Sequence, residues 1–212
     1  MYALNYNSIM NALRRDIANA RVDELLALAD ERGALFWKAS GGLIKSWLSL
    51  LEGHASDAVT SFSSAIPMYR STGATIFVPL FLSIRGRAFA ERRQFDPARR
   101  CIGEAIALAE TSGERWFDAE IYRIGGEIEL GSSERKSPNA QRYFEQALDV
   151  ARAQQARSLE LRAAVSLARL WRDQERRMEA RDLLARVFDW FTEGFDTLDL
   201  KEARSLLKEL VV

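Results

Sequence analysis

The chain has 212 residues, which is enough for one large domain or two small ones. Its 30 Lys and Arg residues balance 30 Asp and Glu residues, which excludes the strongly basic character typical of a nucleic-acid-binding domain. The single cysteine, Cys101, and the single histidine, His54, exclude a disulfide framework and a metal site built from Cys or His clusters. No segment reaches the ~18 apolar residues of a membrane span, and residues 1–15 lack the pattern of a secretory signal. We therefore expect a cytoplasmic protein with no metal, cofactor, membrane or nucleic-acid partner.

Glycines recur at intervals of 40 residues, at Gly33, Gly73 and Gly113, and each follows a helix-like stretch. A glycine just beyond a helix end is typical of a left-handed C-cap. An aromatic residue comes four positions after each glycine. A step of 42 residues reaches the next equivalent position, Leu159, which places a two-residue insertion in the polar segment 132–137. This periodicity indicates a helical repeat protein.

Each repeat contains two helical patterns. The first is an apolar stripe at spacings of four, seven and eleven residues, which is one face of an α-helix. The second begins with an alanine and has a larger apolar residue four positions later. The alanines are Ala18, Ala58, Ala98, Ala140 and Ala180, and the larger residues are Val22, Phe62, Ile102, Phe144 and Leu184. No strand-like alternation competes with these patterns.

The predicted fold is all-α, a right-handed superhelical array of antiparallel helix pairs. Helices are expected at 2–13, 17–32, 35–52, 56–71, 76–92, 97–112, 115–130, 138–154, 158–173, 178–191 and, as a capping helix, 198–210. Pro67 lies inside one of them and should bend or shorten it, because proline has no backbone N–H. No linker interrupts the pattern, so we predict a single domain over residues 1–212. Its units are about 1–33, 34–73, 74–113, 114–155 and 156–192.

Two motifs connect the chain to a known repeat family. The pattern Ala-x3-Phe at Ala58–Phe62 and Ala140–Phe144 resembles the second helix of the tetratricopeptide repeat. Softened forms of the first-helix pattern occur at 82–89 and 164–171. The repeat is about 40 rather than about 34 residues long, and a glycine replaces the terminal proline. The longer helices resemble the tetratricopeptide region of maltose-regulator-type signalling ATPases.

The C-terminal half carries a more specific resemblance, in segments 155–164, 167–174, 179–185 and 190–203. These segments are similar to the C-terminal tail of large bacterial proteins that join a class III adenylate/guanylate cyclase or DNA-binding module to an AAA-type ATPase and a tetratricopeptide array. The resemblance implies a regulatory, protein-binding role and transfers no catalytic residue. It also implies upstream cyclase or ATPase modules of the same polypeptide as partners.

The candidate site is the inner surface, which the first helices of such a solenoid line. Five residues at related positions form it: Trp47, Arg87, Arg123, Glu127 and Arg169. Two interpretations stay open. Neighbouring helices are close enough for these charges to pair with one another, or the arginines and the aromatic residue form a groove for a partner, because arginine forks suit carboxylates and aromatic residues anchor interfaces.

We therefore expect a non-enzymatic module that binds a protein or peptide in a bacterial signalling protein. No phosphate-binding loop or nucleophile elbow occurs in the sequence. The alternative is a structural oligomerisation scaffold without a dedicated ligand site. The first unit lacks a polar cap, which predicts that Met1 is a boundary within a larger protein. An apolar edge at Tyr2, Leu4, Tyr6 and Ile9 would then fray or pair with a second copy of the chain.

Overall fold

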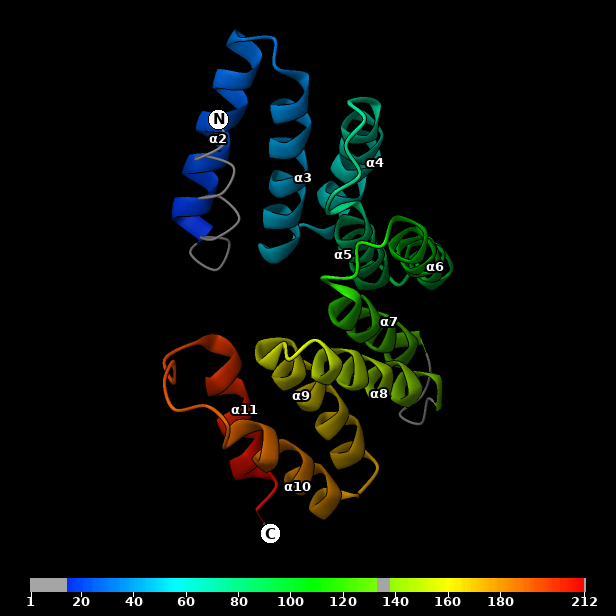
Figure 1. The fold of residues 1–212 in the computed structure, drawn as a ribbon, viewed down its shortest axis with the longest axis vertical. Helices are drawn as coiled ribbons and strands as arrows, with labels where there is room; N and C mark the ends of the chain where they lie inside the picture. Colours follow the sequence, from blue (N-terminus) through cyan, green and yellow to red (C-terminus); the bar gives the residue numbers. More distant parts are fainter. Residues whose placement is uncertain (1–14, 133–137, 212) are drawn as a thin grey trace. The chain divides into compact units, whose positions relative to one another are not determined.

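A computed structural model describes residues 15–132 and 138–211 (Figure 1). Within these two stretches all regular secondary structure is helical, which confirms the predicted all-α repeat fold. The helices are α2 Arg15–Glu31, α3 Leu35–Leu51, α4 Ala55–Ser71, α5 Val78–Glu91, α6 Phe95–Ser112, α7 Asp118–Ser132, α8 Pro138–Ala153, α9 Arg157–Asp173, α10 Arg177–Phe188 and α11 Leu198–Glu209. The predicted helix at 2–13 and the apolar edge from Tyr2 to Ile9 lie outside the described residues.

Two helices begin later than the sequence pattern predicts, and for α5 the backbone shows the reason. α5 begins at Val78 rather than at 76, and α7 begins at Asp118 rather than at 115. Phe77 has a left-handed backbone with a φ of 65°, which a right-handed helix cannot contain. Pro79 then lies in the first turn of α5, where its fixed φ and missing N–H favour a helix start.

Pro67 does not shorten its helix, because α4 continues through this residue to Ser71, and the predicted bend stays a prediction. Proline removes one backbone hydrogen bond from the last turn of the helix. Ile66 and Tyr69, on either side of it, are buried and keep this turn packed against the core. Apolar packing of the final turn therefore outweighs the loss of the hydrogen bond.

The chain forms two compact units, Met1–Cys101 and Ile102–Val212, and the boundary between them falls inside α6. In the first unit, α2 packs on α3, α3 on α4 and α4 on α5, and α3 also contacts α5. Contact of a helix with both the next helix and the next but one is what a stack of helix pairs produces. One continuous right-handed domain over residues 1–212 stays a prediction.

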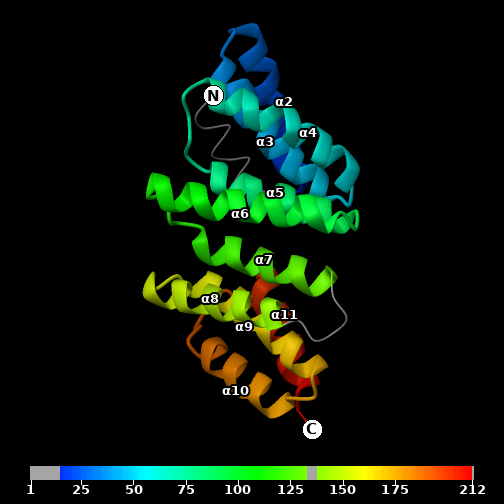
Figure 2. The ribbon, with the colours of Figure 1, turned by 90° about the vertical axis from the view of Figure 1, so that its right-hand side faces the viewer.

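In the second unit, each helix from α7 to α11 packs on the next (Figure 2). α7 also contacts α9, and α9 contacts α11, so these three helices form a row. α11 is the predicted capping helix, and it buries Leu200, Ala203, Leu206 and Leu210 in the core of this unit. The row of α7, α9 and α11 carries the candidate site described below.

The repeated alanines of the second helices are all buried, as the sequence pattern predicts. Ala18, Ala58, Ala98, Ala140 and Ala180 are each 0% exposed. The larger apolar residues four positions later are buried as well. The alanines, with their small side chains, allow helix backbones to approach closely, and the larger side chains fill the space that remains.

Candidate functional site on the first helices of the second unit

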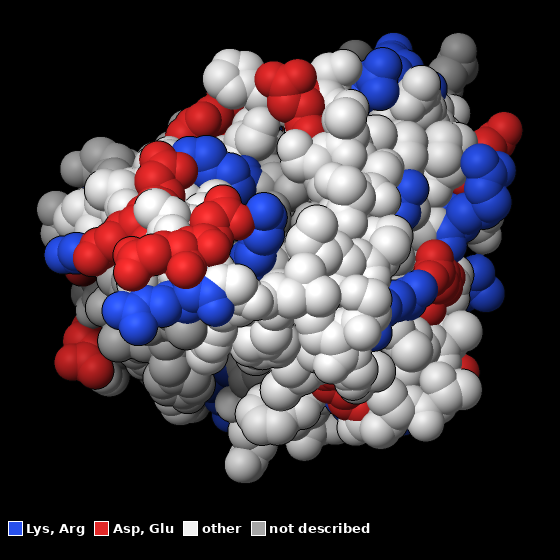
Figure 3. All heavy atoms as spheres, turned by 90° about the horizontal axis from the view of Figure 1, so that it is seen from above, with Lys and Arg blue, Asp and Glu red and all other residues white. Residues whose placement is uncertain are grey.

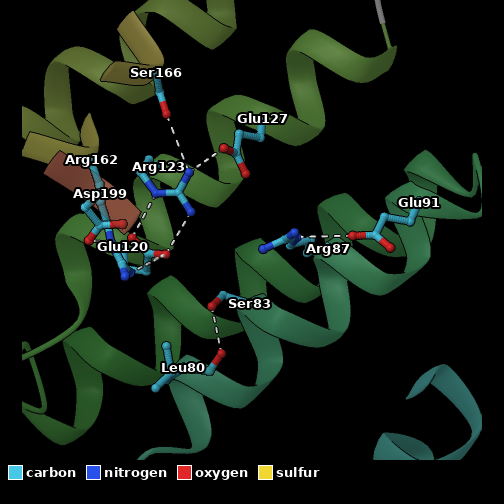
Figure 4. A network of polar contacts seen from close by, with 10 residues as sticks. All are labelled: Leu80, Ser83, Arg87, Glu91, Glu120, Arg123, Glu127, Arg162, Ser166 and Asp199. Carbon is cyan, nitrogen blue, oxygen red and sulfur yellow. Dashed lines mark hydrogen bonds and ion pairs between the residues drawn. The ribbon is translucent and has the colours of Figure 1, made fainter. Parts of the chain in front are cut away.

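Arg123, near the middle of α7, is the centre of a network of charged side chains (Figure 4). Its Nε donates to Glu120 Oε2 at 2.8 Å, and its Nη2 donates to Glu120 Oε1 at 2.8 Å. Its Nη1 donates to Glu127 and, at 3.5 Å, to Ser166 Oγ on α9. The acids lie three residues before and four residues after the arginine, so all three side chains share one helix face. The fork to Glu120 is bidentate, the strongest arrangement of such a pair.

Arg162 of α9 extends this network to the capping helix. Its Nε donates to Asp199 Oδ2 on α11 at 2.8 Å, and its Nη1 lies 3.7 Å from Glu120 Oε1 on α7. Glu120 therefore lies between two arginines, and charged contacts connect α7, α9 and the capping helix α11 (Figure 4).

Burial and the neighbouring acids shift the pKa values of these two arginines in opposite directions. Burial by itself would lower the pKa of the Arg123 guanidinium, but the charges of Glu120 and Glu127 and the hydrogen bonds to them raise it above its ordinary value. For Arg162, burial again lowers the pKa, and Glu120 and Asp199 raise it further than burial lowers it. Both guanidinium groups therefore stay charged at neutral pH.

The structure brings together only some of the residues that the sequence analysis singled out. Arg123 and Glu127 are in contact on α7. Arg169 of α9 pairs instead with Glu202 of the capping helix, Nη2 to Oε1 at 2.5 Å. Arg87 pairs with Glu91 on its own helix, at 3.2 Å (Figure 4). Trp47, in the first unit, packs against a core cluster of Ala18, Val22, Ile44 and Leu48.

These contacts favour the interpretation in which the charges pair within the chain, and the assignment of a partner groove stays a prediction. The predicted set lacked three residues of the network: Glu120, Arg162 and Asp199. Glu120 and Arg162 lie 42 residues apart at equivalent repeat positions, which is a signal that the sequence carries. Asp199 lies in the capping helix, outside the repeat register, so no spacing could have identified it.

The network has a buried layer and an accessible layer. The side chains of Arg123 and Glu120 are each 12% exposed. Glu127, Arg169 and Glu202 are 40%, 45% and 43% exposed. The buried layer contacts α9 through Ser166 and Arg162, and the accessible layer presents both carboxylates and a guanidinium group to solvent on helices.

No group of three or more His, Cys, Asp or Glu side chains gathers as a metal site in the described residues. Cys101 is buried, and His54 is an exposed residue just before α4. None of the helices in residues 15–132 and 138–211 is long and apolar enough to cross a bilayer. In the view of Figure 3, positive and negative side chains are interspersed, so this face carries no broad field of one sign.

Asp118, the first residue of α7, is a buried acid outside this network. It is 8% exposed. Burial raises the pKa of its carboxyl, the nearby Arg115 lowers it, and the charge of Glu110 raises it, with a net rise above the ordinary value. Burial, together with the charge of Asp118, also raises the pKa of Tyr122. An ionised carboxylate at this position is therefore unfavourable in the folded chain.

Replacing Asp118 with asparagine should stabilise the chain at pH 7. The folded carboxyl holds its proton more tightly than the unfolded one, so the stability of the wild-type chain falls as pH rises from the ordinary pKa to the raised one. The asparagine side chain has no charge to bury. Thermal unfolding at a series of pH values should show the Asp118→Asn variant melting above the wild type at pH 7, with the difference vanishing at pH values below about 4. An equal difference at all pH values would contradict the role of this charge.

Comparison with known proteins does not assign this chain to a family. No family model matches the chain. A stretch of 121 residues, 57% of this chain, is 27% identical to an uncharacterized protein of Rhizobium meliloti (strain 1021). That stretch covers 11% of the relative, so the chain spans only a small part of the length of the curated protein that it matches.

Proposed function

We propose that this chain is a non-enzymatic, tetratricopeptide-like module that binds a protein or peptide and thereby regulates a cytoplasmic bacterial signalling protein. The observation that carries the proposal is the accessible layer on α7, α9 and α11, where Glu127, Arg169 and Glu202 lie on helices that the charged contacts of Arg162 connect. Helices give more precise binding geometry than loops.

The pair between Arg169 and Glu202 is the part of this layer best suited to recognition. Both side chains are nearly half exposed, and exposed ion pairs contribute only about 0–1 kcal/mol to stability. A carboxylate from a partner can therefore replace Glu202 at the guanidinium of Arg169 at little cost to the fold. Arginine suits this exchange because its planar fork binds a carboxylate through two parallel hydrogen bonds.

Regulation in this proposal comes from differential binding. A partner shifts a conformational equilibrium only to the extent that it binds one state more tightly than the other. The match to a small part of a much longer bacterial protein supports a module role, and in the proposal the regulated modules are a cyclase or ATPase of the same polypeptide.

Charge reversal at Arg169 tests the proposal. A partner captured from the source bacterium would be purified, and its affinity for three versions of the chain would be measured by calorimetry. Arg169→Glu should weaken binding about tenfold or more, because about 1.4 kcal/mol of lost interaction is a tenfold change. The swap variant Arg169→Glu with Glu202→Arg restores the internal ion pair but moves the positive charge to another helix.

The swap variant separates binding from folding. It should recover the melting temperature of the wild type and keep the binding defect of Arg169→Glu. Wild-type affinity in both variants would contradict the assignment of this surface.

A scaffold role is the second candidate, and large apolar side chains that the second unit exposes favour it. These are Trp116, Met178, Trp190 and Leu198. Light scattering over a range of protein concentrations distinguishes the two. A scaffold should form an oligomer, and Trp116→Ser or Trp190→Ser should dissociate it. A binding module without a scaffold role should stay monomeric at all concentrations.

A further inference from the structure

The segment 85–100, which covers the second half of α5, the turn after it and the start of α6, carries an excess of positive charge. It contains six arginines and two acids, so its net charge is +4, whereas the whole chain has a net charge of zero. Both acids already have an arginine partner, Glu91 in Arg87 (Figure 4) and Asp96 in Arg99. Within the residues that the structure describes, four arginines of the segment form no ion pair, and we call them the basic cluster: Arg85, Arg92, Arg93 and Arg100.

The repeat fold does not account for the charges at the turn between α5 and α6. Residues that are uncharged or acidic occupy the positions of Arg92, Arg93 and Arg100 in the last repeat: Gln174, Glu175 and Asp182. Arg93 also has a left-handed backbone with a φ of 60°, a conformation that favours glycine and that Gly53 adopts in an earlier repeat. An unfavourable conformation that is kept in a folded chain motivates a functional hypothesis for the residue that adopts it.

Arg85 is unfavourable for a different reason. Its Nε is buried and has no hydrogen-bond acceptor in the described part of the chain. At the equivalent position 40 residues earlier, Lys45 Nζ lies 2.8 Å from Asp23 Oδ1 on α2, but Ser63 replaces that acid on α4. A buried donor without an acceptor lowers stability. Because Arg85 is partly exposed, a carboxylate from outside the chain can approach its guanidinium.

The basic cluster is continuous along the chain and in helix phase. Arg85 and Arg92 are seven residues apart, so they share one face of α5 and the residue that caps it. Arg93 lies in the turn, and Arg100 lies in the second turn of α6. Arg92, Arg93 and Arg100 are exposed. The hairpin therefore presents several guanidinium groups to solvent without acids to neutralise them.

Two observations favour an acidic protein segment over a nucleic acid as the ligand. Phe89 and Phe95 are partly buried, and the guanidinium carbons of Arg85 and Arg93 lie 5.3 and 5.9 Å from their ring centroids. Neither ring is therefore open for stacking on a base. The rest of the chain has a net charge of −4, which balances the segment and repels a long polyanion. A short acidic segment can contact the cluster alone.

We propose that the basic cluster binds an acidic segment of a partner protein through aspartate and glutamate carboxylates. The arginine fork binds a carboxylate through two parallel hydrogen bonds, and four such forks on one hairpin fit several carboxylates that are close in sequence. The cluster lies in the first unit, and the proposal does not depend on the surface around Arg169.

The probe is a fluorescently labelled hexaglutamate peptide, and its binding to the whole chain is followed by fluorescence anisotropy at constant ionic strength. Hexaglutamate should bind, hexaglutamine should not, and added NaCl should weaken binding because it screens exposed charges. NMR shifts on titration should be concentrated in the backbone amides of residues 85–100. Arg169→Glu should leave the affinity for hexaglutamate unchanged, which separates this proposal from that for the second unit.

Two sets of variants test the residues. Arg92→Gln with Arg100→Gln should weaken binding about tenfold or more, because charge-assisted contacts are lost. The control is Arg32→Gln with Arg181→Gln, which makes the same change in net charge at exposed positions elsewhere and should leave the affinity unchanged. Arg93→Gly should also weaken binding but should not lower the melting temperature, because glycine suits the left-handed backbone. A purely structural role for Arg93 predicts the opposite pair of results.

Several outcomes overturn the proposal. They are absence of hexaglutamate binding, equal binding of hexaglutamine, and equal loss of affinity in the cluster variant and its control. Loss of affinity in Arg169→Glu but not in the cluster variant assigns the peptide to the other surface. Tighter binding of a short oligothymidylate overturns the proposal in favour of nucleic acid. Displacement of the peptide by an equal concentration of inorganic phosphate overturns it in favour of a small anion.

Discussion

Replacing Phe144 with alanine should lower the free energy of unfolding by about 3–5 kcal/mol, the range found when a buried aromatic side chain is removed. Phe144 is 1% exposed and belongs to the core of the second unit. Its ring packs against the backbone of α7 at Gly126, where an added Cβ would approach three ring carbons to less than 3.0 Å. Urea unfolding followed by circular dichroism measures the loss.

The contact between the ring and Gly126 makes a double-mutant cycle informative. Gly126→Ala should destabilise the wild type, because the rigid ring cannot move aside, and overpacking of a core costs about 1–3 kcal/mol. In a Phe144→Leu background the same substitution should cost less. Gly103→Ala is the matched control, since nothing lies within 4 Å of its added Cβ, and it should stabilise the helix by about 0.5–1 kcal/mol. Additive effects of Gly126→Ala and Phe144→Leu would contradict the contact.

The second large effect is expected at Arg123. Arg123→Met should cost up to about 3–5 kcal/mol, because removal of one partner of a buried pair leaves the other charge less well compensated. The charge left behind is that of Glu120, whose side chain is 12% exposed and whose contact with Arg162 at 3.7 Å is longer than the bidentate pair that is lost. Arg87→Met is the matched control: its pair with Glu91 is exposed and contributes about 0–1 kcal/mol.

A second substitution identifies the cause of that loss. Glu120→Gln in the Arg123→Met background removes the buried negative charge that has lost its bidentate partner, and it should recover part of the stability. Denaturant unfolding of Arg123→Met, of Arg87→Met and of the double variant measures the loss of stability and its recovery. If Arg123→Met costs no more than Arg87→Met, the network does not have the buried character described here.

The fold could be predicted from the sequence because every repeat obeys the same packing requirement. A small residue such as alanine lets two helices of a repeat approach closely. Ala98 and Ala140 are both buried at this position, although a two-residue insertion lengthens the spacing between them from 40 to 42 residues. Helix starts were less predictable. The left-handed backbone of Phe77 has no compositional signal, since glycine usually takes that conformation.

The candidate site was predictable only where its contacts are local. Arg123 and Glu127 lie four residues apart on one helix, so their contact follows from helix geometry. The partners of Arg162 and Arg169 are on α11, which has no counterpart in the repeats. The packing of Trp47 against the first core cluster was also beyond the pattern, because a register assigns a residue to a helix face but does not say how a large ring turns.

The capping helix has a consequence for how the second unit comes apart. α11 contributes Leu200, Leu206 and Leu210 to the same core as Leu184 and Val187 of α10, and its Glu209 holds Arg172 of α9 at 2.8 Å. Helix pairs at the end of a repeat array usually fray first, since each has a neighbour on one side only. Here the terminal pair has neighbours on both sides. Opening α10 therefore requires loss of α11 as well, and the last repeat unfolds together with its cap as one cooperative segment.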